Sequence, residues 1–549
     1  MRFFVMWCWC IAALTAADTF VTRSGSGFQY AGNTFHPAGT NCYYLSYKSD
    51  AMIASVLDDA KAMGLSVVRV WGFMDCGNGD PGATPAVLPL DNKDGVYFQY
   101  WNTATNSLTI NDGPDGLQRL DKVIAMADAR GLKVTVVLVN NWIAFGGMGQ
   151  YLSWFSQAFH DQFYTNSSIV SAYQAYVGHL INRINTVNLR QYKNDTAIFS
   201  WELANEPRCI GSSGGLNRTT IWTTATITTW AGTMANFIKG LDPNHLVAVG
   251  DEGFFNRVSA DWAYAGEGGV DHEALLALTG IDYGTFHCYP DVNHWNKDVA
   301  WGSQWIIDHC AAATVANKPT VLGEYGLEVP RNSESLRMSA YNLWNNALRT
   351  NGGDGSWFWM LAGFDPSGPG LRYPDYDHFT VYLDGSPWQP GTATADDDDV
   401  LSSQAFQLRG LDNRMPIAVA SAVASGVSLT AACDGSGSSD PDGQALTYAW
   451  TFGDGSTGAG LAPSHLYAAS GTYSVTMTVS DPYGVTDSDT RNVSVTTIGG
   501  GGGGGGSGSS TSAGGGGCGL GAGLALLVSV MSVMRLHHRA VYSRQTPRA

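Results

Sequence analysis

The feature that most restricts the fold is an alternation of short apolar runs with amphipathic helical segments along residues 35–411. The apolar runs have the length of buried strands, and the segments between them show the 3.6-residue period of helices. We expect strands at residues 35–41, 66–71, 133–139, 198–203, 246–249, 283–287, 319–323 and 356–359. We expect helices at residues 51–63, 117–129, 168–185, 221–241, 301–317, 334–349 and 402–411, with a poorly defined helix after the fifth strand.

Eight strands that alternate with helices predict an α/β fold, a (β/α)8 TIM barrel with long inserted loops. A doubly wound sheet is the alternative, but the sequence lacks the glycine fingerprint that such sheets carry after a strand. In a barrel the chemistry lies at the carboxyl ends of the strands. Polar residues that interrupt the ends of the apolar runs are therefore the first candidates for a site.

Two glutamates occupy such positions. The run IFSWELANEPRC breaks at Asn205, Glu206 and Pro207, and the apolar run PTVLGEYG ends in Glu324. A single glutamate after a strand is usually a solvated loop residue or a helix cap. Two carboxylates at two strand ends are typical of a glycosidase, which needs one as an acid and one as a base or nucleophile.

The same stretches carry a family resemblance over about residues 28–411. WELANEP with LGEYG downstream resembles glycoside hydrolase family 5, and RVWGF, VNNW, NEPRC, GDEG, GTFHCYPD and WFWM resemble its fungal and plant-type endo-β-1,4-mannanases. The resemblance implies a retaining mechanism with Glu206 as general acid/base and Glu324 as nucleophile. It also implies β-mannan as the substrate. The alternatives are an endo-β-1,4-glucanase or another family 5 hydrolase, and a sugar-binding surface protein without activity.

Four further residues receive roles from this resemblance. Arg69 would keep the nucleophile ionised, although a purely structural ion pair is the alternative. His287 would polarise the acid/base network and Tyr289 would hydrogen-bond the nucleophile; the two alternate along one strand and so share a face. A lone buried histidine is more often structural, and only the HCYP context favours a role in the site. Asn205 would lie at the sugar 2-hydroxyl.

Aromatic and polar residues around these positions are expected to bind the sugar chain. The resemblance places Trp359 under the sugar at the cleavage point, because flat aromatic faces suit the apolar faces of sugar rings. For Trp295 packing within its loop is an equal alternative. The resemblance extends the expected substrate contacts to Trp71, Asn141, Trp142, Arg208 and Trp295.

The net charge of −17 argues against nucleic acid as a partner, since phosphates require a basic surface. A neutral polysaccharide would not be repelled. We expect no cofactor and no metal, because the chain has neither a CxxC pattern nor a phosphate-cradling glycine loop. We expect a monomer.

The first 17 residues read as a secretory signal peptide, with an early arginine, an apolar run and small residues before the cleavage point. A secreted chain can keep disulfides. We expect Cys42 with Cys76, and Cys288 with Cys310, as candidate bridges, and buried free thiols are the alternative for each pair. The catalytic domain would then span residues 18–412.

The composition changes after the barrel. Residues 396–399 form an acidic run that we expect in a solvated loop, with a calcium role as the alternative. Residues 413–497 are rich in glycine, serine and threonine and alternate like short strands, which predicts a small all-β, immunoglobulin-like sandwich. The segment resembles the PKD domain. Its WTFGDG motif fits Trp450 in the core and Gly453, Asp454 and Gly455 in a tight bend.

The last 52 residues read as an anchor. Residues 498–517 form a Gly/Ser-rich linker, and residues 518–549 contain an apolar stretch, 520–534, followed by basic residues. The apolar stretch is short for a bilayer span, but the small residues before it could extend it. The arrangement resembles bacterial sorting signals more than a lipid-anchor signal, which would end in its apolar tail. We therefore expect a secreted protein tethered to the cell surface, with the C-terminal segment in the membrane.

Overall fold

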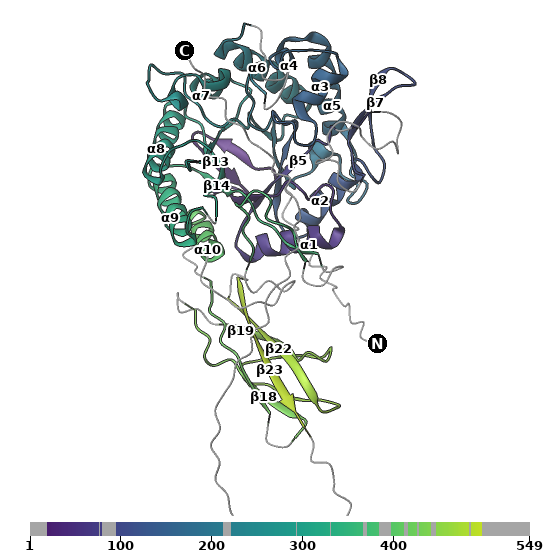
Figure 1. The fold of residues 1–549 in the computed structure, drawn as a ribbon, viewed down its shortest axis with the longest axis vertical. Helices are drawn as coiled ribbons and strands as arrows, with labels where there is room; N and C mark the ends of the chain where they lie inside the picture. Colours follow the sequence, from purple (N-terminus) through teal and green to yellow (C-terminus); the bar gives the residue numbers. More distant parts are fainter. Residues whose placement is uncertain are drawn as a thin grey trace, which may run out of the picture. The chain divides into compact units, whose positions relative to one another are not determined.

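A computed structural model describes residues 19–496 with gaps at residues 76, 79–94, 212–220, 293, 330, 366–370, 384–396, 411–414, 425–427, 441–445 and 482–484. Its first domain is built on eight parallel strands in the order β11-β10-β9-β5-β4-β14-β13-β12 (Figure 1). The strands are β4 (Ala38–Asn41), β5 (Val67–Trp71), β9 (Lys133–Val137), β10 (Ile198–Glu202), β11 (Leu246–Ala248), β12 (Gly284–Cys288), β13 (Thr320–Tyr325) and β14 (Gly355–Phe358).

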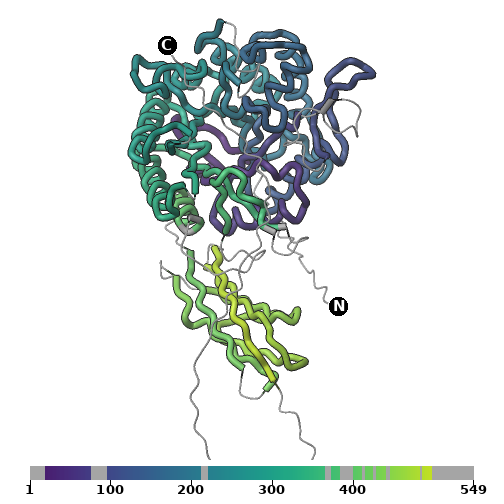
Figure 2. The backbone as a smooth tube through the Cα atoms, viewed as in Figure 1, coloured from purple at the N-terminus to yellow at the C-terminus, as the bar shows by residue number. Residues whose placement is uncertain are grey.

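The sheet closes on itself. The last strand along the chain, β14, pairs with the first, β4, and the trace in Figure 2 runs once around this ring from purple to green. The remaining seam, between β11 and β12, is joined by the backbone N–H of Asp282, which donates to the carbonyl of Val247 at 2.8 Å. All eight strands are buried along their whole length, as expected for a parallel sheet covered on both faces. The predicted TIM barrel is confirmed.

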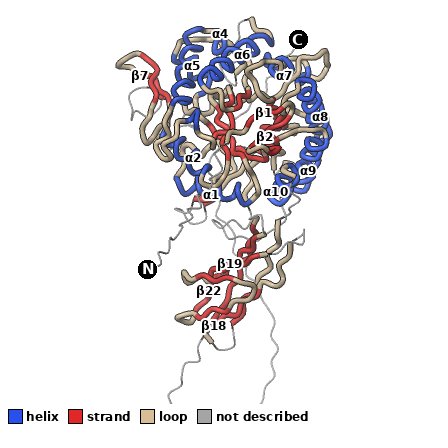
Figure 3. Tube along the Cα trace, turned by 180° about the vertical axis from the view of Figure 1, so that it is seen from behind, coloured by secondary structure: helices blue, strands red, loops and turns tan. Residues whose placement is uncertain are grey.

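Helices surround the strands, as the view from behind in Figure 3 shows. They are α1 (Asp50–Ala62), α2 (Gln118–Asp128), α3 (Gly147–Trp154), α4 (Gln162–Thr165), α5 (Ser167–Asn182), α6 (Thr224–Leu241), α7 (His272–Leu276), α8 (Val299–Ala316), α9 (Glu334–Thr350) and α10 (Asp397–Leu408). Short 3-10 helices lie at Tyr192–Asn194, Trp262–Tyr264 and Glu267–Gly269. The fifth unit carries only the five residues of α7, which explains its weak helical pattern.

The prediction for the acidic run at the start of helix α10 is wrong. The acidic run at residues 396–399 was expected in a solvated loop, but Asp397 begins helix α10. Acidic residues in a first helical turn interact favourably with the positive end of the helix dipole. The run therefore fits a helix start as well as it fits a loop, and a pattern of charge alone does not distinguish the two.

A small antiparallel sheet precedes the barrel and was not predicted. It consists of β1 (Thr22–Ser24), β2 (Gly27–Tyr30) and β3 (Asn33–Phe35). Phe28 of β2 is 1% exposed, and its ring lies 5.4 Å from the rings of Phe199 and Tyr283. Both partners lie at or just before the amino ends of barrel strands, so the sheet covers the end of the barrel opposite the site. Two further small sheets consist of β6 (Gly77–Asn78), β7 (Gln99–Asn102) and β8 (Ser107–Ile110), and of β15 (Phe364–Asp365) and β16 (Leu371–Arg372).

The second domain is an all-β sandwich with the sheets β17-β18-β21 and β20-β19-β22-β23. Its strands are β17 (Ser421–Ala424), β18 (Thr430–Asp434), β19 (Thr447–Thr451), β20 (Thr457–Ala459), β21 (Ser464–Leu466), β22 (Gly471–Ser480) and β23 (Thr486–Val495). Trp450 is 1% exposed in its core, and Gly453 and Gly455 have φ values of 78° and 89°. The expected core tryptophan and tight bend are confirmed, because only glycine adopts such φ values without strain.

The described cysteines are free thiols. Cys288 and Cys310, a candidate bridge, are both buried and unbridged, so the free-thiol alternative holds for this pair. Burial raises the pKa of Cys310 to about 12, which makes its thiol unreactive. Cys42 is also a buried free thiol, and its candidate partner Cys76 lies outside the described residues.

The signal peptide, the glycine-rich linker and the apolar segment 520–534 all lie outside the described residues. Within the described part of the chain, no helix is long and apolar enough to cross a membrane.

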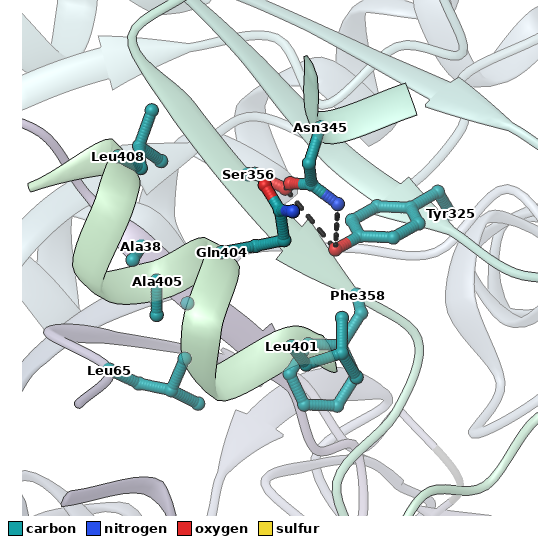
Figure 4. Close-up of a pocket in the computed structure, with 11 residues that line it drawn as sticks. Ala38, Leu65, Tyr325, Asn345, Ser356, Phe358, Leu401, Gln404, Ala405 and Leu408 are labelled. Atoms are coloured by element: carbon teal, nitrogen blue, oxygen red, sulfur yellow. Dashed lines mark hydrogen bonds between the residues drawn. The ribbon is translucent and has the colours of Figure 1, made fainter. Parts of the chain in front are cut away.

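A small cavity lies between helix α10 and the strands, and Figure 4 shows its lining. Its volume is about 10 Å³, which is room for about one water molecule. The hydroxyl of Tyr325 accepts from Asn345 at 3.1 Å and from Ser356 at 3.2 Å beside it. The cavity is too small for a sugar and belongs to the packing of the barrel.

Candidate active site

The predicted catalytic pair lies at the carboxyl ends of the barrel strands. Glu324 belongs to β13 and is 4% exposed, and Glu206 follows β10 and is 9% exposed. The backbone of Glu206 has a φ of 51°, in the left-handed region that residues other than glycine adopt uncommonly. Its N–H donates to the carbonyl of Gly250 at 2.8 Å, so the turn that presents the carboxyl group is tied to the neighbouring strand.

The two carboxyl groups are close. A carboxylate oxygen of Glu206 and one of Glu324 lie within 4.8 Å of each other, and a ring nitrogen of His287 lies within the same distance of both. Retaining glycosidases hold their carboxyls about 5 to 5.5 Å apart, whereas inverting enzymes leave about 6.5 to 9.5 Å for a water molecule. The spacing fits direct attack by one carboxylate.

Glu324 is surrounded by donors that favour its ionised form. Arg69 Nη1 donates to its Oε1 at 2.6 Å, and the Tyr289 hydroxyl donates to its Oε2 at 2.8 Å. Burial raises the pKa of Glu324, and His287, Arg69 and the Tyr289 hydroxyl oppose that shift, while the charge of Glu206 adds to it. The structure thus brings together three residues that the sequence placed at one site.

Arg69 holds more partners than the sequence suggested. Its Nε donates to Glu202 at 2.6 Å, its Nη1 also donates to Asn41 at 3.0 Å, and its Nη2 donates to Asn205 at 2.9 Å. The side chains of Arg69 and Glu202 are completely buried. Glu202 was missed, although it stands in the same WELANEP motif as Glu206. A buried guanidinium between two carboxylates positions both, since its fork geometry fixes the directions of the bonds.

Glu206 is better placed than Glu324 to carry a proton. Burial raises its pKa, and the indole N–H of Trp142, which donates to Oε2, opposes that shift. His287 Nδ1 lies 2.7 Å from Oε1 of Glu206, and burial lowers the pKa of this histidine. Two buried carboxyls this close favour sharing one proton. Because Arg69 and Tyr289 favour the charge on Glu324, we assign the proton to Glu206.

Asn205 is held from two sides. Its Oδ1 accepts from Arg69, and its Nδ2 donates to Asn140 Oδ1 at 3.1 Å. The side chain is 5% exposed. Asn140 was not among the predicted residues, although it is the first asparagine of the VNNW motif. The amide plane of Asn205 is therefore fixed beside the catalytic pair.

An aromatic wall borders the carboxyls. Trp359 is half-buried, and its ring centroid lies 5.9 Å from that of Trp71 and 5.8 Å from that of Tyr43, with which it is nearly parallel. Its indole N–H donates to Asp377 at 2.7 Å, which fixes the orientation of the ring. Tyr43 and Asp377 were missed, because neither stands in a motif that ends an apolar run.

Arg208 belongs to a second ion pair beside Glu206. Its Nε and Nη2 donate to the two oxygens of Glu252, each at 2.6 Å, and its guanidinium lies 5.3 Å from the Trp142 ring. Burial and the charge of Glu206 raise the pKa of Glu252 to about 7. Glu252 was missed as a site residue although it lies in the GDEG motif. Asn141 accepts from the backbone N–H of Arg208 at 3.1 Å, so it positions this loop.

Trp295 lies in a buried aromatic cluster. It is 6% exposed and packs against the rings of Phe254, Trp262 and Trp305 at 5.6 to 6.1 Å. Trp295 thus packs within an aromatic cluster, and its contact with the sugar chain stays a prediction.

Two groups of side chains bring potential metal ligands within 4.8 Å of one another. They are Glu206, His287 and Glu324, and Asp291, His294 and Glu328. In the first group Glu324 is already paired with the Arg69 cation. In the second, Asp291 Oδ1 accepts from the backbone N–H and lies 2.9 Å from the ring Nδ1 of His294. The ligand atoms of both groups are thus engaged within the protein.

Comparisons with known proteins agree with this geometry. Residues 18–347 match a family described as GH family 5 beta-mannosidase-like, and residues 413–497 match the PKD domain. The mannan endo-1,4-beta-mannosidase F of Aspergillus fumigatus is 37% identical over 383 residues, which is 69% of this chain and 78% of that protein. The mannan endo-1,4-beta-mannosidase A of Hypocrea jecorina is 36% identical over 378 residues, or 68% of this chain and 76% of that protein.

A solved structure is similar as well. The endo-1,4-beta-mannanase from Rhizomucor miehei superposes with a TM-score of 0.61 at 36% sequence identity, covering 71% of this chain and 99% of its own.

Proposed function

We infer that this chain, which belongs to glycoside hydrolase family 5, is a mannan endo-1,4-β-mannosidase that cleaves internal β-1,4-mannosidic bonds with retention of configuration. The single observation that carries the mechanism is the spacing of Glu206 and Glu324, whose carboxylate oxygens lie within 4.8 Å of each other. That distance is shorter than the about 6.5 to 9.5 Å at which inverting enzymes hold their carboxyl groups to accommodate a water.

In the first step Glu324 attacks the anomeric carbon while Glu206 transfers its proton to the leaving glycosidic oxygen. A covalent glycosyl-enzyme forms and the aglycone chain departs. In the second step Glu206, now ionised, removes a proton from water, the water oxygen attacks the anomeric carbon, and Glu324 is released as a carboxylate. Glu206 thus ends protonated, as it began.

The surrounding residues have distinct parts in this proposal. Arg69 and Tyr289 hold Glu324 ionised and aimed, and His287 and Trp142 orient Glu206. Asn205, fixed by Arg69 and Asn140, is proposed to meet the 2-hydroxyl at the cleavage point. A site that hydrogen-bonds a hydroxyl in one orientation rejects the other, because the mismatch leaves buried polar groups unpaired.

Aromatic and charged groups bind the rest of the polymer in this proposal. Trp359 supports the sugar at the cleavage point, with Trp71 beside it. Arg208 and its partner Glu252 offer hydrogen bonds to sugars beyond Glu206. The chain is proposed to act as a monomer.

The purified enzyme is expected to cut galactomannan or glucomannan into short oligosaccharides and to leave carboxymethyl-cellulose nearly untouched. Reducing-end assays on the three polymers, run side by side, measure this. Comparable rates on mannan and cellulose would support the endoglucanase alternative, and binding of mannan without turnover would support a non-catalytic sugar-binding protein.

We further propose secretion and tethering to the cell surface, from the signal-like residues 1–17 and the glycine-rich and apolar segments after residue 497. The PKD domain would act as a spacer between the catalytic domain and the tether. Truncation after Ile498 is expected to release active, soluble enzyme. Loss of activity on soluble mannan in the truncated form, or free full-length protein in the medium with its C-terminus intact, contradicts the anchor.

A further inference from the structure

A segment that follows the last barrel strand, residues 372–382, contacts the residues of the site. It is attached to the chain just after β14 by backbone bonds: Val381 donates to the carbonyl of Met360 at 2.8 Å, and Ala362 donates to the carbonyl of Val381 at 2.9 Å. We call residues 372–382 the bracing segment. None of its residues is among the site residues that the sequence predicted.

The bracing segment supplies a polar partner to each of two neighbouring rings of the aromatic wall. Asp377 Oδ2 accepts from the indole N–H of Trp359 at 2.7 Å, and the Tyr373 hydroxyl donates to the hydroxyl of Tyr43 at 3.0 Å. The rings of Trp359 and Tyr43 lie 5.8 Å apart at an angle of 15°. Because hydrogen bonds are directional, a bond at the polar edge of a ring restricts the plane of that ring. The segment therefore restricts the orientation of both rings.

The same segment packs against the donor to the nucleophile. The ring of Phe379 lies 5.4 Å from that of Tyr289 in an edge-to-face arrangement. A Cβ at Gly326 would lie 2.5 Å from the Phe379 ring, so the segment approaches the end of β13 closely. Tyr289 in turn donates to Glu324. The bracing segment thus contacts both the aromatic wall and the partner of the nucleophile.

Asp377 joins the aromatic wall to the backbone of this segment. Its Oδ1 accepts from the backbone N–H of Phe379 at 3.2 Å, while its Oδ2 accepts from Trp359. A carboxylate accepts at both oxygens, whereas an amide of the same shape has one oxygen and a donating NH2 group. An asparagine at this position could therefore serve only one of the two N–H groups.

We propose that the bracing segment positions the aromatic wall for the substrate, with Asp377 as the positioning residue for Trp359 and Tyr373 as the positioning residue for Tyr43. The proposal rests on the mannanase function for the identity of the sugar. A platform that is held in one orientation before the sugar arrives loses less freedom on binding, so the polymer binds more tightly. The bonds are made in the free enzyme and support the ground state and the transition state alike. Their loss weakens binding and leaves the chemical step unchanged.

The test compares Asp377→Asn with the unsubstituted chain by initial-rate kinetics on soluble galactomannan. The substitution keeps the shape of the side chain and removes its charge and one acceptor. We expect KM to rise about tenfold, as for the loss of a hydrogen bond to a charged group, and kcat to stay within about twofold. A carboxylate with a merely structural role would instead lower the melting temperature and the fraction of active enzyme, which reduces the apparent kcat and not KM.

Asp375→Asn is the matched control, because it removes the same charge from the same segment. Oδ1 of Asp375 accepts from the backbone N–H groups of His378 and Thr380 at 2.8 and 3.3 Å, and neither bond reaches a residue of the site. An asparagine keeps such an oxygen. KM and kcat of Asp375→Asn should therefore equal those of the unsubstituted chain.

Tyr373→Phe provides a second variant, which decides the question if Asp377→Asn does not fold, as judged by its melting transition. It removes the hydroxyl that donates to Tyr43 and leaves the bond between Asp377 and Trp359 in place. We expect a KM about threefold higher, since the lost bond joins two neutral groups.

An unchanged KM in folded Asp377→Asn, or an equal rise in Asp377→Asn and Asp375→Asn, overturns the proposal; without a folded Asp377→Asn, an unchanged KM in Tyr373→Phe does so. This failure differs from that of the proposed function. Absence of mannan hydrolysis by the unsubstituted chain refutes the proposed function, whereas hydrolysis with a KM that these substitutions leave unchanged refutes the positioning role.

Discussion

Replacing Tyr289 by phenylalanine tests how the nucleophile is kept ionised. The Tyr289 hydroxyl donates to Glu324 at 2.8 Å, and both side chains are buried. Burial raises the pKa of Glu324, and this hydroxyl is one of the groups that oppose the shift. Its removal therefore raises that pKa further. Because only the ionised form attacks the sugar, the acidic limb of the kcat/KM profile should move to higher pH.

The size of the effect follows from the charge of the acceptor. A hydrogen bond to a charged group is worth about 1.5 to 3 kcal/mol and one between neutral groups about 0.5 to 1.5. Tyr289 therefore favours the carboxylate over the neutral acid by roughly 1.4 kcal/mol, which is about a tenfold change in the ionisation equilibrium. We expect Tyr289→Phe to lower kcat/KM about tenfold at pH values below the acidic limb, with a smaller effect on the plateau.

The assay is hydrolysis of a soluble mannan, or of an activated mannoside, across the pH range in which the enzyme stays folded. Tyr325→Phe is the matched control, because it is the next residue after Glu324 and equally buried, but its hydroxyl bonds Asn345 and Ser356 (Figure 4). Its acidic limb should not move. An unchanged limb in Tyr289→Phe, or a shift to lower pH, would refute the assignment of Glu324 as the ionised nucleophile.

Three further predictions concern buried carboxyl groups. Trp142→Phe removes a donor that lowers the pKa of Glu206, so the basic limb of kcat/KM should move to higher pH, and an unmoved limb would assign the acid elsewhere. Glu324→Ala should abolish turnover of mannan, and azide should restore part of it on an activated substrate as the α-glycosyl azide; a β-azide would contradict the nucleophile. Burial raises the pKa of Asp354 to about 7, above its unfolded value, so this group favours folding at low pH and that contribution is lost as pH rises toward 7. The upper bound of this contribution to the free energy of unfolding is about 4 kcal/mol. The melting temperature of Asp354→Asn should therefore fall less between pH 5 and 8 than that of the unsubstituted chain.

The barrel and its catalytic pair could be read from local patterns. A strand buried on both faces must be apolar along its length, so a glutamate that ends such a run lies at the edge of the sheet. The carboxyl ends of parallel strands meet at one face of a barrel, which brings Glu206 and Glu324 together although 118 residues separate them. The motifs around Arg69, His287 and Tyr289 then indicated the chemistry.

The partners within the site were decided only by the tertiary structure. Glu202 and Asn41 bind Arg69, Asp377 orients Trp359, and Glu252 pairs with Arg208. Each of these contacts joins residues from different strands or loops. The separation of these residues in the sequence follows no helical or strand period, so it could not indicate the contact. Loop conformation and strand register fix them.

The same reason explains the less successful expectations. Trp295 packs in an aromatic cluster assembled from several loops, which the sequence could not show, and its contact with the sugar stays a prediction. Cys288 and Cys310 are free thiols. Their pairing could not be predicted, because a disulfide depends on the distance and direction of the two side chains, which the spacing of cysteines in the sequence does not reveal. Sequence determined which residues reach the mouth of the barrel, because strand periodicity is local. The tertiary structure decided which of these residues contact one another, because contacts between different strands and loops are not local in the sequence.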